Sequence, residues 1–292
     1  MFRFAACSRR VRLPLVIAAM ALSLSACTNF IYDRLDTLAA WYIQRLVSLD
    51  DDQRSDLRSS LESTLQWHRE AELARYAKLL RELADTTARP GDPVLYRSVG
   101  AQIEEFGSRL VERAAPEAAR LLLKLNPAQL TELETNLAER SGKRNARDLK
   151  ALAQGTWHER RARDIEKQLK RWTGAVTREQ QSMIAQQSRR FEPTTEEWLE
   201  SQARWREALF AALRARFDSS LSPSDVEERI LALLRKPDSQ WTDAYRSKAA
   251  RNREQSLAAL AALDASLTPA QRSHLQRELT RLAQQLVALA QR

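Results

Sequence analysis

Hydrophobic positions along this chain repeat with the period of an α-helix. In the last segment, leucines step by four and three positions like the seam of a coiled coil: Leu275, Leu279, Leu282, Leu286 and Leu289. Near the beginning, apolar positions also share one helical face: Ile31, Leu35, Leu38, Tyr42, Leu46 and Leu49. No stretch shows sustained two-residue alternation of β-branched side chains. The pattern therefore predicts an all-α fold, an elongated bundle of long antiparallel helices.

Proline and glycine indicate where these helices end. The segment 85–93, "DTTARPGDP", is expected to form a loop, with Pro93 in the first turn of the next helix. Further breaks are expected at four places: Ala115-Pro116, Gly174, Glu192-Pro193 and Lys236-Pro237. We expect Gly142 and Gly155 to weaken, but not to end, one long helix over 127–172.

Five short segments share the residue order of a helix capping box. In "LTPAQ", Thr268 suits the N-cap, Pro269 suits the first turn, and Gln271 can reach back to the backbone N–H of the cap. The same order begins at Leu49, Leu125, Val176 and Leu221, the last with Asp225 in place of glutamine. The last four caps are 51, 45 and 46 residues apart, which favours degenerate helical repeats, although the first gap of 76 residues breaks the spacing.

The first 26 residues have the features of a lipoprotein signal peptide. Four arginines precede an apolar run, 13–26, that is too short to cross a bilayer as a mature helix. It ends in "LSAC", which resembles a lipobox, the motif whose cysteine receives a diacylglycerol thioether and becomes the new N-terminus. The alternative is an ordinary secretory peptide with a chance cysteine. We therefore expect residues 1–26 to be removed and Cys27 to carry the lipid.

Processing at Cys27 would leave one all-helical domain, 27–292, with 85–93 or 174–193 as places for a subdivision. Thr28 follows the cysteine, where many inner-membrane lipoproteins have aspartate. This favours the outer membrane, facing the periplasm, over the inner membrane. Cys7 leaves with the signal peptide, so the mature domain has no thiol for disulfides, metal binding or nucleophilic chemistry.

The charge of the chain is moderately basic and concentrated in one segment. The chain has 47 basic and 38 acidic residues, and loss of the four signal-peptide arginines leaves 43 against 38. In an envelope protein this favours anionic lipid head groups or acidic polypeptides as partners, and not nucleic acid. Segment 140–171 alone holds eleven basic and four acidic residues.

Eight residues of this segment form a candidate surface for binding acidic clients or anions. Four share one helical face, Arg140, Lys143, Arg144 and Arg147, and four share another, Arg160, Arg163, Lys167 and Lys170. Beside them lies an apolar stripe of Trp157, Ile165, Leu169 and Trp172. The more common role of such a pattern is a solvated face above a packed core, and both interpretations remain open here.

The sequence offers little for catalysis. Its three histidines, His68, His158 and His274, have no second histidine or cysteine at ligand spacing. His68 continues a leucine stripe, so we expect a hydrogen-bonded, partly buried side chain. The acidic triplet 50–52 suits the positive end of a helix dipole better than a metal ion. With no nucleophile elbow, phosphate loop or zinc motif, we predict no enzyme activity, no metal and no cofactor.

Two families resemble parts of the chain. "YDRLDTLAAWYIQRLVSLDDDQ" and "WHREAELARYAKLL" are similar to an uncharacterised family of proteobacterial lipoproteins, which implies a lipoprotein and a helical fold but no activity. "LTPAQ" resembles the repeated L-T-x-x-Q motif of Spy-type periplasmic chaperones, small helical proteins that bind unfolded clients. Those chaperones are shorter, dimeric and usually not lipidated.

These observations predict a non-enzymatic binding protein held at the membrane by its N-terminal lipid. A chaperone-like or envelope-stress role, with unfolded or acidic envelope proteins as clients, is the leading hypothesis. The alternative is a structural scaffold or assembly subunit that docks one specific envelope partner. A chaperone binds many clients weakly, whereas a scaffold co-purifies with one partner at a fixed ratio.

Overall fold

The computed structural model describes residues 32, 34–86, 91–217 and 222–292. In chain order its helices are α3 (Leu35–Gln44), α4 (Asp51–Ala71), α5 (Leu73–Asp85), α6 (Pro93–Leu123), α7 (Pro127–Ala153), α8 (Trp157–Thr173), α9 (Arg178–Ser188), α10 (Thr195–Ala215), α11 (Pro223–Arg235), the 3₁₀ helix η2 (Pro237–Gln240), α12 (Asp243–Ala265) and α13 (Pro269–Ala290). These residues contain no strand, so the predicted all-α fold is confirmed. The signal peptide and Cys27 lie outside the described residues.

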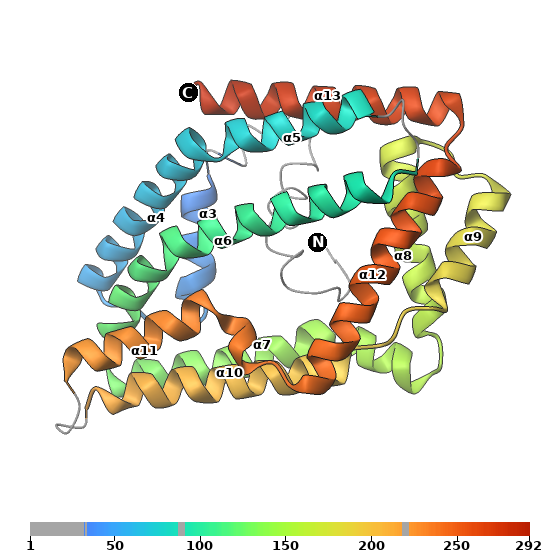
Figure 1. Cartoon of the computed structure of the whole chain (residues 1–292). Helices are drawn as coiled ribbons and strands as arrows, with labels where there is room; N and C mark the ends of the chain where they lie inside the picture. The colour runs from blue at the N-terminus through green and yellow to red at the C-terminus, as the bar shows by residue number, and fades with distance from the viewer. Residues whose placement is uncertain (1–31, 33, 87–90, 218–221) are drawn as a thin grey trace.

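The helices form a frame that α6 crosses (Figure 1). Helices α5 and α13 pack along each other on one side, and α7 and α10 pack along each other on the opposite side. The remaining two sides are formed by α3 with α4 and by α8 with α9 and α12. Helix α6 contacts α4, α11 and α12. None of the helices in the described part of the chain combines the length and the apolarity needed to cross a bilayer.

One predicted helix end is wrong, and one helix end was not predicted. Pro116 lies inside α6 instead of ending it, between the buried Ala115 and the fully buried Ala119. Packing of this segment therefore outweighs the lost backbone hydrogen bond of proline. Gly155 has φ +66°, a left-handed conformation that glycine adopts without strain, and it separates α7 from α8 where one long helix was expected. The expected breaks at 85–93 and Gly174 are confirmed.

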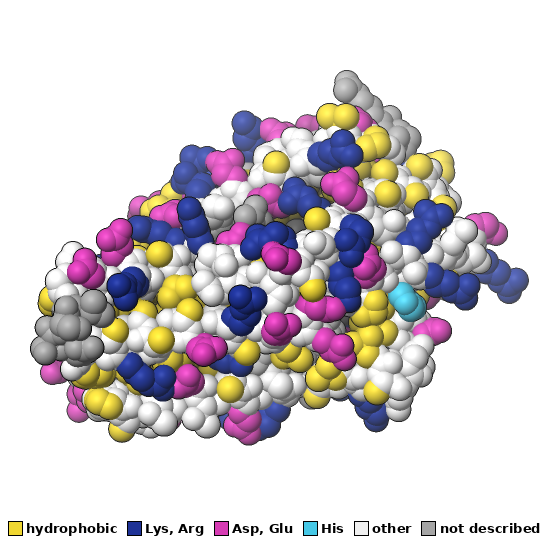
Figure 2. Space-filling model, turned by 60° about the horizontal axis from the view of Figure 1, so that its bottom comes forward, with side chains coloured by type: hydrophobic (Ala, Val, Ile, Leu, Met, Phe, Trp, Pro, Cys, Tyr) yellow, Lys and Arg dark blue, Asp and Glu magenta, His cyan; other side chains and the backbone are white. Residues whose placement is uncertain are grey.

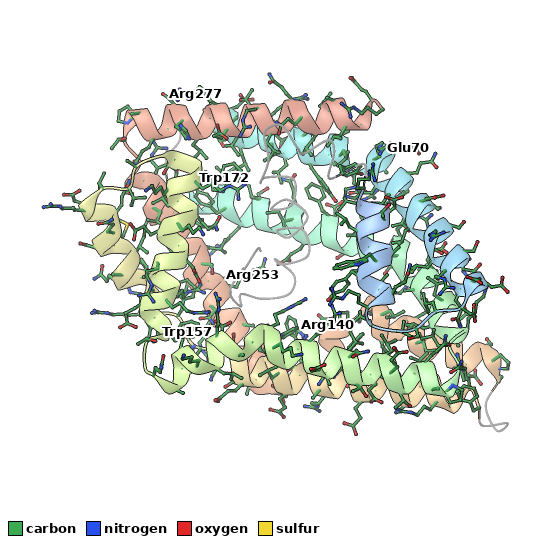
Figure 3. The ribbon with its side chains drawn as sticks, turned by 180° about the vertical axis from the view of Figure 1, so that it is seen from behind. Glu70, Arg140, Trp157, Trp172, Arg253 and Arg277 are labelled. Atoms are coloured by element: carbon green, nitrogen blue, oxygen red, sulfur yellow. The ribbon has the colours of Figure 1, made fainter. Side chains whose placement is uncertain are left out.

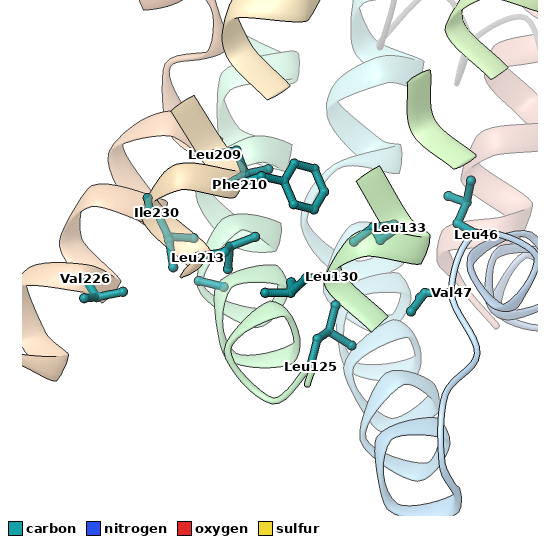
Figure 4. Packing of buried hydrophobic residues seen from close by; sticks show 12 residues of the cluster. Leu46, Val47, Leu125, Leu130, Leu133, Leu209, Phe210, Leu213, Val226 and Ile230 are labelled. Atoms are coloured by element: carbon teal, nitrogen blue, oxygen red, sulfur yellow. The ribbon is translucent and has the colours of Figure 1, made fainter. Parts of the chain in front are cut away.

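The largest hydrophobic cluster joins α7, α10 and α11 to the segment between α3 and α4 (Figure 4). Phe210 and Leu213 of α10 are fully buried there, against Leu130 of α7 and Ile230 of α11. A second cluster confirms the predicted leucine seam of α13: Leu282, Leu286 and Leu289 are buried against Leu73 and Ala77 of α5.

Four of the five predicted caps are complete capping boxes, at Asp50, Asn126, Thr177 and Thr268. Ser222 caps α11 through its side chain, but Asp225 is exposed and no reciprocal bond forms. The four complete boxes differ from the fifth in having glutamine, and all four glutamines are buried. Their burial shows that these side chains do more than close one helical turn.

The four glutamines meet in two pairs. The side-chain amides of Gln53 and Gln129 exchange hydrogen bonds of 3.1 and 2.7 Å, and those of Gln180 and Gln271 exchange two of 2.9 Å. Each amide also donates to the backbone carbonyl that lies five positions before the glutamine it pairs with. Gln53 donates to Lys124 and Gln129 to Ser48, and in the second pair Gln180 donates to Ser266 and Gln271 to Ala175. Each side-chain oxygen accepts, in addition, from the N–H of its own cap. Every strong donor of these buried amides is thus used.

These pairs reveal an internal correspondence between 35–153 and 157–290. Helix α3 packs on α4 as α8 packs on α9, and α4 contacts α6 as α9 contacts α12. The α5–α13 and α7–α10 pairs each join one helix from either half. The matched unit is therefore a pair of caps 76 or 91 residues apart and not a repeat of about 45 residues.

Candidate functional site

The eight predicted basic residues lie on α7 and α8, two helices joined by a sharp turn at Gly155. Three of them have structural partners. Arg160 pairs with the buried carboxylate of Asp148, which ties α8 to α7. Lys143 pairs with Glu139 one turn before it. Arg140 donates to the backbone oxygen of Arg45 at 3.1 Å and lies on the inner side of the frame in Figure 3.

The other five are exposed: Arg144, Arg147, Arg163, Lys167 and Lys170. No acidic side chain within the described ranges forms an ion pair with any of them. Three of these, Arg163, Lys167 and Lys170, follow one another at helical spacing along a single exposed stripe of α8. Their charges are therefore available to an external anion.

The apolar stripe of α8 is largely packed inside the protein. Trp157 is 6% exposed and lies in a cluster with Ala151, Phe191 and Ala259. Trp172 packs, partly buried, on the α5–α13 cluster. Ile165 and Leu169 are half-buried. For the aromatic residues of the stripe, the core interpretation is confirmed, and the exposed part of α8 is mainly charged.

Elsewhere the surface carries mixed charges. On the side formed by α7, α10 and α11, basic and acidic side chains alternate (Figure 2). Many are paired, for example Arg214 with Glu134 and Lys248 with Glu197. The unpaired bases of α7 and α8 differ from exposed bases elsewhere in that three of them follow one another along one stripe of a single helix.

Helix α3 exposes apolar side chains, including Leu38 and Tyr42 of the predicted apolar face. Leu38 is 49% exposed, Trp41 56% and Tyr42 39%. Only Ala40 of the helix is buried. The guanidinium of Arg45 lies 4.8 Å from the ring centre of Trp41, and that of Arg140 lies 4.9 Å from the ring centre of Tyr42. Sequence reasoning missed this surface because an apolar stripe does not reveal whether another helix covers it.

His68 belongs to a buried polar cluster at the junction of α4 and α5. Its Nδ1 shares a hydrogen bond of 2.9 Å with the Tyr32 hydroxyl, and its ring packs edge-on to Tyr76. Glu72, fully buried one turn later, accepts from Arg109 of α6 at 2.7 Å. Burial lowers the pKa of His68 from 6.5 to about 4. Burial, with the negative charge of Glu72, raises the pKa of Tyr76. His68 is therefore neutral at neutral pH, and its hydrogen bond to Tyr32 fits the expected structural role.

No three His, Cys, Asp or Glu side chains of the described segments come together in a group that could hold a metal ion. His158 shares a hydrogen bond of 2.9 Å with the backbone oxygen of Ser188, which links α8 to the end of α9. The two candidate surfaces for partners are thus the bases of α7 and α8 and the aromatic face of α3.

Fold and surface define an all-α protein made of two matched sets of helices, each of which contains one pair of glutamine caps. The model of a family of unknown function, DUF6279, matches residues 45–246. The match covers more than half of the chain, and the protein therefore belongs to this family. No curated protein and no solved structure matches it. The predicted resemblance to an uncharacterised family is confirmed, whereas lipidation and similarity to Spy-type chaperones stay predictions.

Proposed function

We propose that this protein is a lipid-anchored binding protein of the bacterial cell envelope, without enzymatic activity, that holds acidic polypeptides through α7 and α8. The proposal rests on the five exposed bases of these helices, Arg144, Arg147, Arg163, Lys167 and Lys170, which have no acidic partner among the described residues. Such charges attract acidic chains over a distance and release them as salt increases. The lipid at Cys27 would hold the domain at the outer membrane, on its periplasmic side.

The packing of Trp157 and Trp172 favours the scaffold form of this function over the chaperone form. An unfolded client is held partly by apolar burial, and these two side chains are already used inside the protein. A folded acidic partner can be held by charge and hydrogen bonds at a polar surface. The scaffold form therefore predicts one partner at a fixed ratio, whereas the chaperone form predicts many clients.

A binding experiment separates these forms. The chain without residues 1–27 retains all contacts named above, because they lie within 32–292. The test variant replaces Arg144, Arg147, Arg163, Lys167 and Lys170 with glutamine. The matched control replaces five exposed bases on other helices with glutamine: Arg58, Arg75, Arg81, Arg229 and Arg277. Both variants lose the same charge, so any difference between them reports the position of the charge.

The assay is aggregation of reduced α-lactalbumin, an acidic unfolded client, at low and at physiological salt. The chaperone form predicts protection that the control variant keeps, that the test variant loses, and that weakens as screening shortens to about 8 Å. No protection at several-fold excess rules out the chaperone form. Crosslinking of the full, anchored chain then tests the scaffold form. Failure to recover a partner that depends on the five bases would refute the proposed binding surface.

The anchor has its own test. Cys27→Ser should abolish incorporation of labelled palmitate and leave the domain out of the outer membrane. Undiminished labelling of that variant would overturn the lipobox interpretation.

A further inference from the structure

Helix α3 has an unusually large uncovered apolar face. Leu38, Trp41 and Tyr42 are three of the six large hydrophobic side chains that stand exposed in the described part of the chain. The other three, Val94, Phe217 and Leu260, lie on or beside three different helices. Scattered single residues of this kind are normal on protein surfaces, but three within one turn and a half of helix indicate an interaction site.

The edge of this face is positively charged. Arg45 is exposed and stacks on Trp41, while Arg140 reaches across from α7 to stack on Tyr42. No carboxylate in the described residues forms an ion pair with either guanidinium. Tryptophan and tyrosine prefer the boundary between water and acyl chains, and arginine can keep its charge at the phosphate level while its stem lies on apolar surface. The combination suits an interfacial helix.

Chain length places this face near the proposed lipid anchor. Leu35, the first residue of α3, is eight positions after Cys27. Eight residues span at most about 28 Å even when fully extended. Since the tether is short, the local concentration of membrane around α3 is high, and modest interfacial affinity is enough to keep the helix bound.

We propose that α3 lies in the interface of the bilayer that holds the anchor, with Leu38 and Trp41 at the level of the upper acyl chains. Arg45 and Arg140 then pair with the phosphates of anionic head groups. This inference rests on the lipidation of Cys27 proposed above. Helix α3 lies on the face presented in Figure 3, whereas α12 lies on the face presented in Figure 1. The contact therefore fixes which side of the frame faces the membrane, which a lipid chain alone does not do.

Depth measurements on the lipidated full chain test this orientation. In that chain the thioether blocks Cys27, so Leu38→Cys provides a single thiol for a nitroxide, and Leu260→Cys on α12 provides the matched control. In vesicles of phosphatidylethanolamine and phosphatidylglycerol, the probe at residue 38 should be accessible to oxygen and shielded from a water-soluble nickel chelate. The probe at residue 260 should show the reverse. Equal chelate access at both positions overturns the proposal, and spin–spin broadening at residue 38 indicates a second copy instead.

A partition experiment separates failure of this inference from failure of the anchor. The chain without residues 1–27, which carries neither the lipid nor the apolar run of the signal peptide, should still bind anionic vesicles weakly. Replacement of Leu38 and Trp41 with serine should lower its partition coefficient at least about tenfold, because both apolar side chains lose their burial. Leu260→Ser should leave the coefficient unchanged. If the α3 variant and the control bind alike, α3 is not a membrane contact, whatever the state of Cys27.

Discussion

The pairing of Gln180 with Gln271 allows the energetic role of these capping boxes to be measured. Gln180 is 1% exposed, and Gln180→Ala removes five side-chain hydrogen bonds: two with Gln271, two to the carbonyl and hydroxyl oxygens of Ser266, and one from the N–H of Thr177. A buried hydrogen bond contributes about 1 kcal/mol net, and its loss costs more when the partner stays unsatisfied. We therefore expect Gln180→Ala to lower the free energy of unfolding by about 3–4 kcal/mol.

Two further variants show whether this stability comes from the cap or from the glutamine pair. Gln180→Glu keeps an oxygen that can accept from the Thr177 N–H, so the local cap survives, but it has no donor for Gln271 or Ser266. If the glutamine pair contributes more stability than the cap, Gln180→Glu should lower the free energy of unfolding nearly as much as Gln180→Ala does. The double variant of Gln180 and Gln271 should cost about 1–2 kcal/mol less than the sum of the two single variants, because their mutual bonds are then counted once.

Urea unfolding followed by far-ultraviolet circular dichroism measures these differences. Gln181→Ala is the matched control, since that exposed neighbour makes one bond, to Glu166, at 2.7 Å. Gln181→Ala should change the free energy of unfolding by no more than about 0.5 kcal/mol. A cost below about 1 kcal/mol for Gln180→Ala, or additive single and double variants, would show that the glutamine pair does not hold the two helices together.

Two other predictions concern pH and the caps. Because burial holds the pKa of His68 at about 4 against 6.5 when unfolded, the unfolded chain binds a proton first as the pH falls, and stability is lost between these values. From pH 7 to pH 5 the loss of stability attributable to His68 should be about 2 kcal/mol. Urea unfolding of His68→Gln should lack this part of the pH dependence. Thr268→Ala should cost about 1 kcal/mol in the same assay, because the N–H of Gln271 loses its 3.3 Å acceptor. A neutral stability effect combined with lost client binding would instead assign the cap a direct functional role.

Local signals in the sequence were enough to predict the helices and most of their starts. A cap acts within one turn, so Thr268 and Gln271 could be assigned roles from their spacing alone. The pairing of Gln180 with Gln271 could not, because the partners are 91 positions apart and meet only after several helices have packed. The helix end predicted at Pro116 was wrong for a similar reason, because long-range packing of α6 outweighs the local tendency of proline to end a helix.

The candidate surface was predictable as a concentration of charge but not residue by residue. Arg160 and Arg140 are taken up by Asp148 and by the backbone of Arg45, and no periodicity indicates those contacts. Conversely, the spacing identified the helical face containing Leu38 and Tyr42 as apolar, but it gave no sign that this face is exposed. Hydrophobic spacing reports which residues share a face, whereas exposure depends on whether another element covers it.

The internal correspondence shows where the two halves of the protein differ. Helices α3 and α8 occupy matched positions, each directly before the first glutamine cap of its pair and packed on the helix which that cap starts. The aromatic ends of α8 are covered, Trp157 by the α7, α9 and α12 region and Trp172 by α5 and α13. Trp41 of α3 has no such cover. Since the matched position can be closed by packing, the open face of α3 is not imposed by the architecture, and it lies in the half that begins eight residues after Cys27. This asymmetry is the strongest structural reason to seek the membrane contact at α3 and the charged partner at α8.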